Sequence, residues 1–119
     1  MINDYLASEG SKRFADFEKL ACSFALPGID SDIAYLALGL NGEAGEVAEK
    51  IKKIIRDKGG VVTELEKADL ISELGDVLWY TTMIAHALGY SLKNVAASNI
   101  YKCCDRKSRG VIHGDGDDR

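Results

Sequence analysis

The sequence has little proline, which interrupts helices, and little cysteine, which cross-links chains. Its 119 residues include one proline, Pro27, and three cysteines, Cys22, Cys103 and Cys104. An odd cysteine count without a C-x-x-C pair gives no support to a disulfide framework or a cysteine-based metal site. We therefore expect reduced cysteines and a cytoplasmic protein.

Two further features are missing, an excess of positive charge and a long hydrophobic run. The net charge is -4, which is unlike the basic surface of a protein that binds a nucleic-acid duplex. No apolar run approaches the roughly 20 residues needed to cross a membrane, and residues 1–9 have no apolar signal core. The sequence therefore predicts a soluble protein without duplex or membrane partners, and an acidic chain that binds polyphosphates needs cations to do so.

The residues that are present favour helices. Hydrophobic residues make up 46% and charged residues 29% of the chain, as in an ordinary globular domain, and strand-like alternation is almost absent. The apolar residues recur at helical spacing instead. We predict one all-α domain over residues 1–119, a four-helix bundle with short loops and an irregular tail at 110–119. The predicted helices cover residues 3–25, 32–57, 63 or 65 to 88, and 91–107.

Four carboxylates stand out on the two central predicted helices. Glu43 and Glu46 are three residues apart, as are Glu73 and Asp76, so each pair shares one helix face. If the two helices pack antiparallel, the pairs can converge. Like charges about 4 Å apart repel by about 4 kcal/mol at an effective dielectric constant of 20, so such a cluster requires cations. Oxygen ligands suit Mg²⁺ or Mn²⁺ rather than zinc.

The residues around these acids leave two interpretations open. Gly42, Gly45 and Gly75 lie beside the carboxylates, and each costs a helix about 1 kcal/mol relative to alanine. That cost indicates close helix packing or access for a ligand. The alternative is an exposed acidic face with i,i+4 ion pairs, such as Glu46 with Lys50.

Longer segments carry a resemblance to a known family. LGLNGEAGEVAEKIKK at residues 38–53 and ELGDVLWY at 73–80 surround the two acidic pairs, and NIYK at 99–102 precedes DRKSRG at 105–110. Over residues 33–114 the sequence resembles the MazG-like family of all-α nucleoside triphosphate pyrophosphohydrolases.

The resemblance implies a Mg²⁺-dependent enzyme that assembles as a homodimer or homotetramer. It implies cleavage of the nucleotide between the α and β phosphates, with Mg²⁺ bound by Glu43, Glu46, Glu73 and Asp76; Mn²⁺ is a possible substitute. The preferred candidate for the catalytic base is Glu46, and Glu43 and Glu73 are alternatives.

Five further residues are candidates for substrate binding. The resemblance assigns Asn99 and Lys102 on the last helix, and Arg106 shares their face. Lys53 lies seven residues after Glu46, where it could meet a phosphate. Trp79 lies three residues after Asp76, where it could stack on a base or belong to the core.

Two other functions remain open at this point. One is a non-catalytic helical module that binds metal and forms oligomers. The other is an enzyme of the dUTPase or dCTPase type with a narrow base preference. A di-iron protein is disfavoured because such bundles use Glu-x-x-His pairs, and this sequence contains none.

Overall fold

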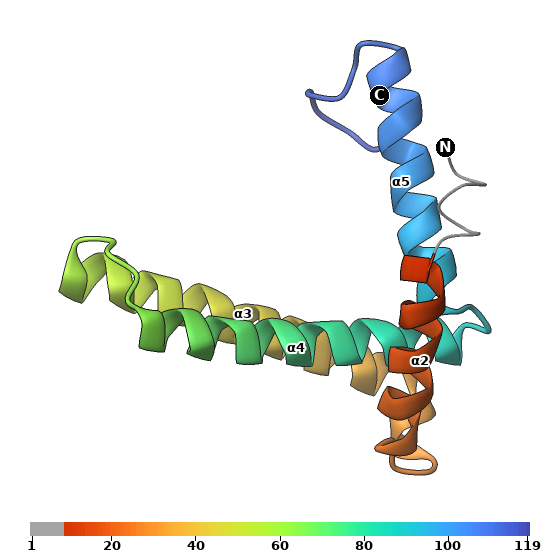
Figure 1. The fold of residues 1–119 in the computed structure, drawn as a ribbon, viewed down its shortest axis with the longest axis horizontal. Coiled ribbons are helices and arrows are strands. Elements are labelled where there is room, and N and C mark those ends of the chain that lie inside the picture. Colours follow the sequence, from red (N-terminus) through yellow and green to blue (C-terminus); the bar gives the residue numbers. More distant parts are fainter. Residues whose placement is uncertain (1–8) are drawn as a thin grey trace.

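The computed structural model describes residues 9–119, and these residues form helices and turns without a strand (Figure 1). The all-α prediction is thereby confirmed. The elements in chain order are the helix α2 (Glu9–Ser23), the short 3-10 helix η1 (Ile29–Ser31), and the helices α3 (Ile33–Lys58), α4 (Glu64–Ala87) and α5 (Leu92–Ser108). The first six residues of the predicted helix 3–25 lie outside the described part of the chain.

Helices α3, α4 and α5 begin at side chains that cap their first amides. The Asp32 carboxylate accepts hydrogen bonds from the backbone N–H groups of Ala34, at 2.9 Å, and Tyr35, at 3.3 Å. Thr63 and Ser91 form capping boxes at the starts of α4 and α5. These caps satisfy amides that have no partner within the helix, which explains why the three predicted boundaries lie within a residue or two of those observed.

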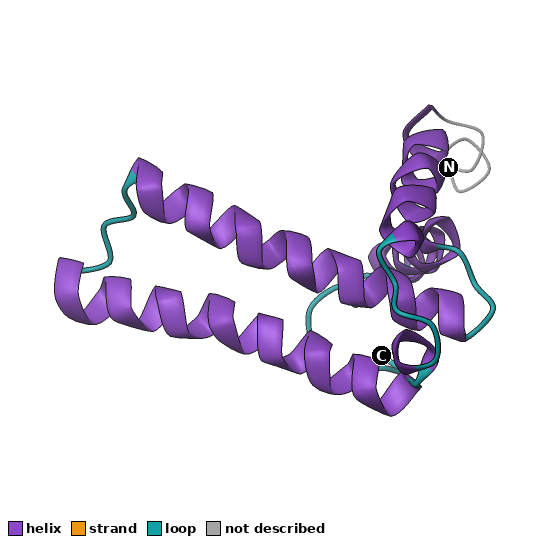
Figure 2. Cartoon of the chain, turned by 90° about the horizontal axis from the view of Figure 1, so that it is seen from below, coloured by secondary structure: helices purple, strands orange, loops and turns teal. Residues whose placement is uncertain are grey.

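The two long helices, α3 and α4, form an antiparallel hairpin (Figure 2). Lys50 of α3 forms an ion pair with Glu73 of α4, and Lys58 forms one with Glu66. Residue numbers therefore rise along α3 as they fall along α4. Helices α2 and α5 do not run alongside this hairpin; both lie across one end of it (Figure 1).

The core lies where α2 crosses that end of the hairpin. Ala21, Leu36 and Met83, one from each of α2, α3 and α4, form a buried cluster. Trp79 and Tyr80 pack against this cluster with their rings edge to face at 5.0 Å. The indole N–H of Trp79 donates a hydrogen bond to the Ala21 carbonyl at 3.1 Å, so the tryptophan also ties α4 to the end of α2.

Helix α5 and the residues after it are held by polar contacts. The Glu18 carboxylate of α2 accepts a hydrogen bond from the Leu92 amide at 3.0 Å, at the start of α5. The chain after Ser108 has no helix and folds back along α5, where the Arg106 guanidinium donates to the Asp117 carbonyl at 2.7 Å. Over residues 9–119 no helix is both long and apolar enough to cross a membrane.

The closest approach of a glycine in the hairpin to its neighbours occurs at Gly39. A methyl group added there would lie 2.2 Å from the Tyr80 ring, whereas one added at Gly42, Gly45 or Gly75 would meet nothing within 4 Å. Close packing of α3 on α4 thus depends on Gly39. The glycines beside the acids leave open space next to the carboxylates.

Gly39→Ala is expected to destabilise the fold by about 1–3 kcal/mol, because the Tyr80 ring must move out of a packed position. The matched control is Gly42→Ala, which meets open space and is expected to stabilise α3 by about 0.5–1 kcal/mol. Chemical denaturation followed by circular dichroism measures both changes. Equal effects of the two substitutions would contradict the special role of Gly39.

Candidate metal centre

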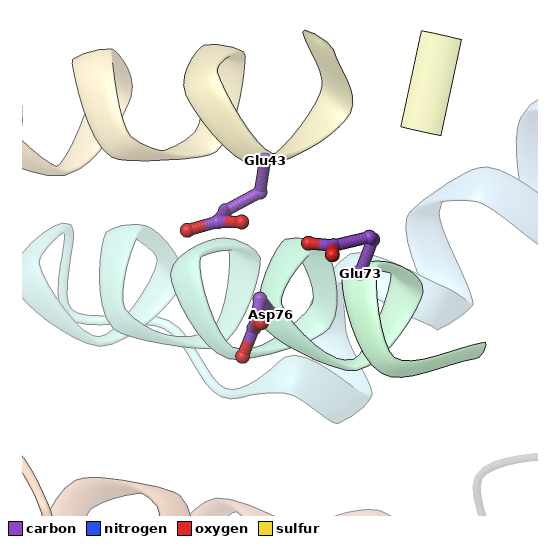
Figure 3. A group of neighbouring side chains, drawn as sticks. All are labelled: Glu43, Glu73 and Asp76. Atoms are coloured by element: carbon purple, nitrogen blue, oxygen red, sulfur yellow. The ribbon is translucent and has the colours of Figure 1, made fainter. Parts of the chain in front are cut away.

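Three of the four predicted acids meet between the two long helices. One carboxylate oxygen each from Glu43, Glu73 and Asp76 lies within 4.8 Å of the others. Glu43 projects from α3 towards Glu73 on α4, and Asp76 lies one turn further along α4 (Figure 3). Helical periodicity explains the arrangement, because Glu43 shares a row with the buried Leu36 and Ile54 that faces α4.

The electrostatics of Glu43 show that negative charge is concentrated here. Burial between the helices raises the pKa of its carboxyl group, and the charges of Asp76, Glu73 and Glu46 together with a hydrogen bond to Glu73 raise it further. Glu43 and Glu73 are half-buried and Asp76 is exposed. A charged Glu43 therefore lacks enough positive charge around it, and a cation among the three carboxylates would supply that charge.

Lys50 supplies part of the compensation. Its ammonium lies 2.9 Å from Glu73 Oε1 across the helix interface, and only 32% of its side chain and 17% of that of Glu73 are exposed. The hydrogen bond to Glu73 raises the pKa of Lys50, partial burial opposes this, and the charges of Glu73, Asp69 and Glu46 reinforce it. The i,i+4 pair of Lys50 with Glu46, which the sequence left open, gives way to this pair between helices.

Glu46 takes a different position from the other three acids. It is exposed and does not join the group of converging oxygens. Its charge still acts on Glu43. The structure therefore places Glu46 at the solvent side of the cluster, and its role as a metal ligand stays a prediction.

The structure separates the five predicted substrate-binding residues into different places. Lys53 is exposed, pairs with Glu49 at 3.3 Å and lines a groove next to Lys50. Trp79 packs on the core cluster, as described above. Arg106 is 8% exposed and holds the C-terminal residues.

Asn99 and Lys102 line a separate hollow between the end of α4 and α5, together with Tyr90. Both residues are exposed, and Asn99 accepts a contact from the Cys103 thiol at 3.9 Å. Within one chain the structure does not bring them to the acids. Their part in substrate binding stays a prediction.

The sequence reasoning missed the importance of Lys50 and Asp69. Lys50 lies seven residues after Glu43, and Asp69 lies four residues before Glu73, so each shares a helix face with its acid. Both line the groove beside the carboxylates. The spacing could have identified them, but only the register of α3 against α4 shows which residues they face.

The residues present fit a divalent cation with a preference for oxygen ligands. Three carboxylates from two helices converge, the surrounding negative charges and burial raise the pKa of Glu43, and the group contains neither histidine nor cysteine. This donor set is typical of Mg²⁺ or Mn²⁺ sites. The fold and the site thus define a class, an all-α protein with a carboxylate cluster that could hold a metal ion.

Comparison with known proteins identifies the family within this class. Residues 32–111 match the model of the MazG nucleotide pyrophosphohydrolase domain, so the chain belongs to this family. The gene 37 protein of Mycobacterium phage L5 is 51% identical over 87 residues, which cover 73% of this chain and 76% of that protein. The search of solved structures gave no significant match.

The raised pKa of Glu43 predicts a pH-dependent effect of Glu43→Gln on the metal-free protein. A raised carboxyl pKa means that the folded state favours the protonated form, so this group destabilises the fold as pH rises from about 4, the ordinary carboxylate range, towards neutrality. Glu43→Gln is therefore expected to raise the melting temperature at neutral pH, with a gain that disappears as pH falls to about 4. Thermal denaturation in EDTA at a series of pH values measures this gain.

Glu49→Gln provides the control for this experiment. Hydrogen bonds from Lys52 and Lys53 lower the pKa of Glu49, so its substitution is expected to give no gain at neutral pH. A gain for Glu43→Gln that is the same at every pH would contradict the electrostatic explanation.

Proposed function

We propose that this protein is a Mg²⁺-dependent nucleoside triphosphate pyrophosphohydrolase that releases a nucleoside monophosphate and pyrophosphate. The observation that carries the proposal is the convergence of Glu43, Glu73 and Asp76 between α3 and α4 in a chain of the MazG family. These three carboxylates would hold the cation. The glycines that leave open space beside them, Gly42 and Gly75 among them, support access for a large substrate.

In this proposal the three converging acids hold the cation, and the fourth acid, Glu46, acts as the base. Bound Mg²⁺ would neutralise the triphosphate oxygens and polarise the phosphorus under attack. Glu46, which is exposed and outside the group of converging oxygens, would accept a proton from the attacking water. Lys53 borders the adjacent groove, from which its ammonium can reach a phosphate by leaving Glu49.

The exposed apolar side chains support a homodimer or homotetramer. Ile51 and Ile55 follow the inward-facing Lys50 and Ile54 by one position on α3. On α4, three residues likewise come directly after an inward-facing residue, namely Ile71, Leu74 and Leu78. Because α3 and α4 are antiparallel, this shift turns both sets to the same side of the hairpin. All five are exposed, Ile55 by 62% and Ile71 by 68%.

The extended shape of the chain also supports an oligomer. Its radius of gyration is 16.9 Å, whereas a compact domain of this length has a radius of roughly 13–14 Å. Exposed apolar side chains gathered on one side of a hairpin are typical of an interaction surface. A second copy with the same face is the partner that symmetry favours, because one patch can then bury itself on both subunits.

An oligomer would also allow Asn99 and Lys102 to take part in substrate binding. They lie on α5, which extends away from the hairpin (Figure 1), in a hollow apart from the acids. We expect them to contact a nucleotide that is held by the acids of another subunit. In that arrangement each site is complete only in the assembly.

A panel of ribonucleoside and deoxyribonucleoside triphosphates tests the activity. With Mg²⁺, pyrophosphate is the expected product, and Glu73→Gln is expected to lower the rate by about a hundredfold or more because a metal ligand is lost. Glu49→Gln, an acid that pairs with Lys52 and Lys53 outside the cluster, should retain the activity of the original protein.

The other possible outcomes of the panel would favour a different reaction or function. Orthophosphate as the sole product would contradict cleavage between the α and β phosphates. Turnover of only dUTP or dCTP would favour an enzyme with a narrow base preference. Divalent-cation binding without any product would favour a non-catalytic metal-binding and oligomerisation module.

Ile55→Glu and Ile71→Glu test the proposed assembly. Each places a charge on the apolar face and removes an apolar side chain that contributes about 1.5–3 kcal/mol when buried, so association should weaken by about tenfold or more. Light scattering after size-exclusion chromatography measures the mass. Leu65→Glu is the control, because Leu65 is 81% exposed but turned away from this face. An unchanged mass for both isoleucine variants would place the interface elsewhere.

A further inference from the structure

Lys50 connects the acidic cluster to the groove beside it. It lies two helical turns after Glu43 on the row of α3 that faces α4, and its ammonium contacts Glu73 Oε1 at 2.9 Å. The neighbouring lysines behave differently, since Lys52 and Lys53 both pair with Glu49 on their own helix. Among these three lysines, Lys50 is the one that spans the helix interface.

The ion pair of Lys50 is not an ordinary surface pair. Both side chains are less than one-third exposed, and Glu73 contributes an oxygen to the converging group of three. Asp69 and Glu46 also act on Lys50 through their charges. The ammonium therefore lies among carboxylates, where it supplies one positive charge at the junction of α3 and α4.

Glu73 consequently has two possible partners that compete for its charge. It pairs with Lys50 in the metal-free protein, and in the proposed function it is a ligand of the divalent cation. A carboxylate that shares its charge with a dication attracts an ammonium less, and the dication itself repels that ammonium. The two positive charges therefore compete for one carboxylate.

We propose that Lys50 is a positioning residue that serves as an internal counter-ion, holding Glu73 across the helix interface until a divalent cation displaces it. This inference rests on the proposed function only in that Glu73 binds the cation. Lys50 thereby keeps α3 and α4 together while the site is empty of metal, and it lowers the affinity of the site for the cation.

The structure provides a place for the displaced ammonium. Lys50 lines the wall of the adjacent groove together with Asp69, whose charge already acts on the lysine. Its flexible four-carbon stem allows the charge to turn from Glu73 towards Asp69 without a movement of the backbone. The exchange thus moves one side chain from one carboxylate towards another.

The experiment compares Lys50→Met with the matched control Lys52→Met. Mn²⁺ is titrated into each protein without nucleotide, and free Mn²⁺ is followed by electron paramagnetic resonance. Lys50→Met is expected to bind Mn²⁺ about tenfold more tightly than the original protein because no ammonium has to be displaced. Lys52→Met and Lys50→Arg, which keeps the charge, are expected to bind with unchanged affinity.

Thermal denaturation supplies the second measurement. In EDTA, Lys50→Met should melt at a lower temperature than the original protein because Glu73 loses its partner. At saturating Mg²⁺ the two melting temperatures should coincide, since Lys50 no longer contacts Glu73 in either case. Lys50→Gln, which retains a hydrogen-bond donor but not the charge, gives the same expectation if the methionine variant does not fold.

The outcomes separate this inference from the proposed function. Mn²⁺ affinity of Lys50→Met that is unchanged or weaker, or a melting deficit that persists at saturating Mg²⁺, would overturn the counter-ion role while the metal centre stands. An original protein that binds no Mn²⁺ would overturn the metal centre and the inference together.

Discussion

The packing of α3 against α4 brings negative charges together that would otherwise repel one another. Glu43 and Glu73 lie on the inward rows of the hairpin because apolar neighbours on the same rows, such as Leu36 and Ile54, are buried. The hydrophobic contacts thus hold carboxylates in a half-buried position that raises the pKa of Glu43. A cation bound among these carboxylates would offset their mutual repulsion.

The rest of the fold packs against one end of the α3–α4 hairpin and leaves the other end uncovered. Helix α2 crosses the hairpin where Ala21 and Met83 are buried, and the Trp79 indole fixes it there through the Ala21 carbonyl. Beyond the acids the hairpin has the buried Ile54, ion pairs and an exposed apolar side. That division places the core at the crossed end of the hairpin and leaves apolar side chains of α3 and α4 exposed.

Several features of the fold and site could be predicted from the sequence because they depend on local spacing. Gly59 and the capping residues Asp32, Thr63 and Ser91 define helix ends through contacts within four residues. The i,i+3 spacing of the two acidic pairs depends only on helical geometry. The ion pair of Lys50 with Glu73 could not be predicted in this way, because an i,i+4 pair with Glu46 satisfied the same spacing rule.

The sequence by itself determined that the chain is helical, where most helices begin and end, and which family it belongs to, because these follow from short-range periodicity, capping and motif residues. The tertiary structure decided which acids converge. It selected Glu43, Glu73 and Asp76 and left Glu46 exposed, and it placed Asn99 and Lys102 in a separate hollow. The physical reason is the register and crossing of the helices, which depend on how Gly39, Tyr80 and the core side chains fit together across elements far apart in the chain.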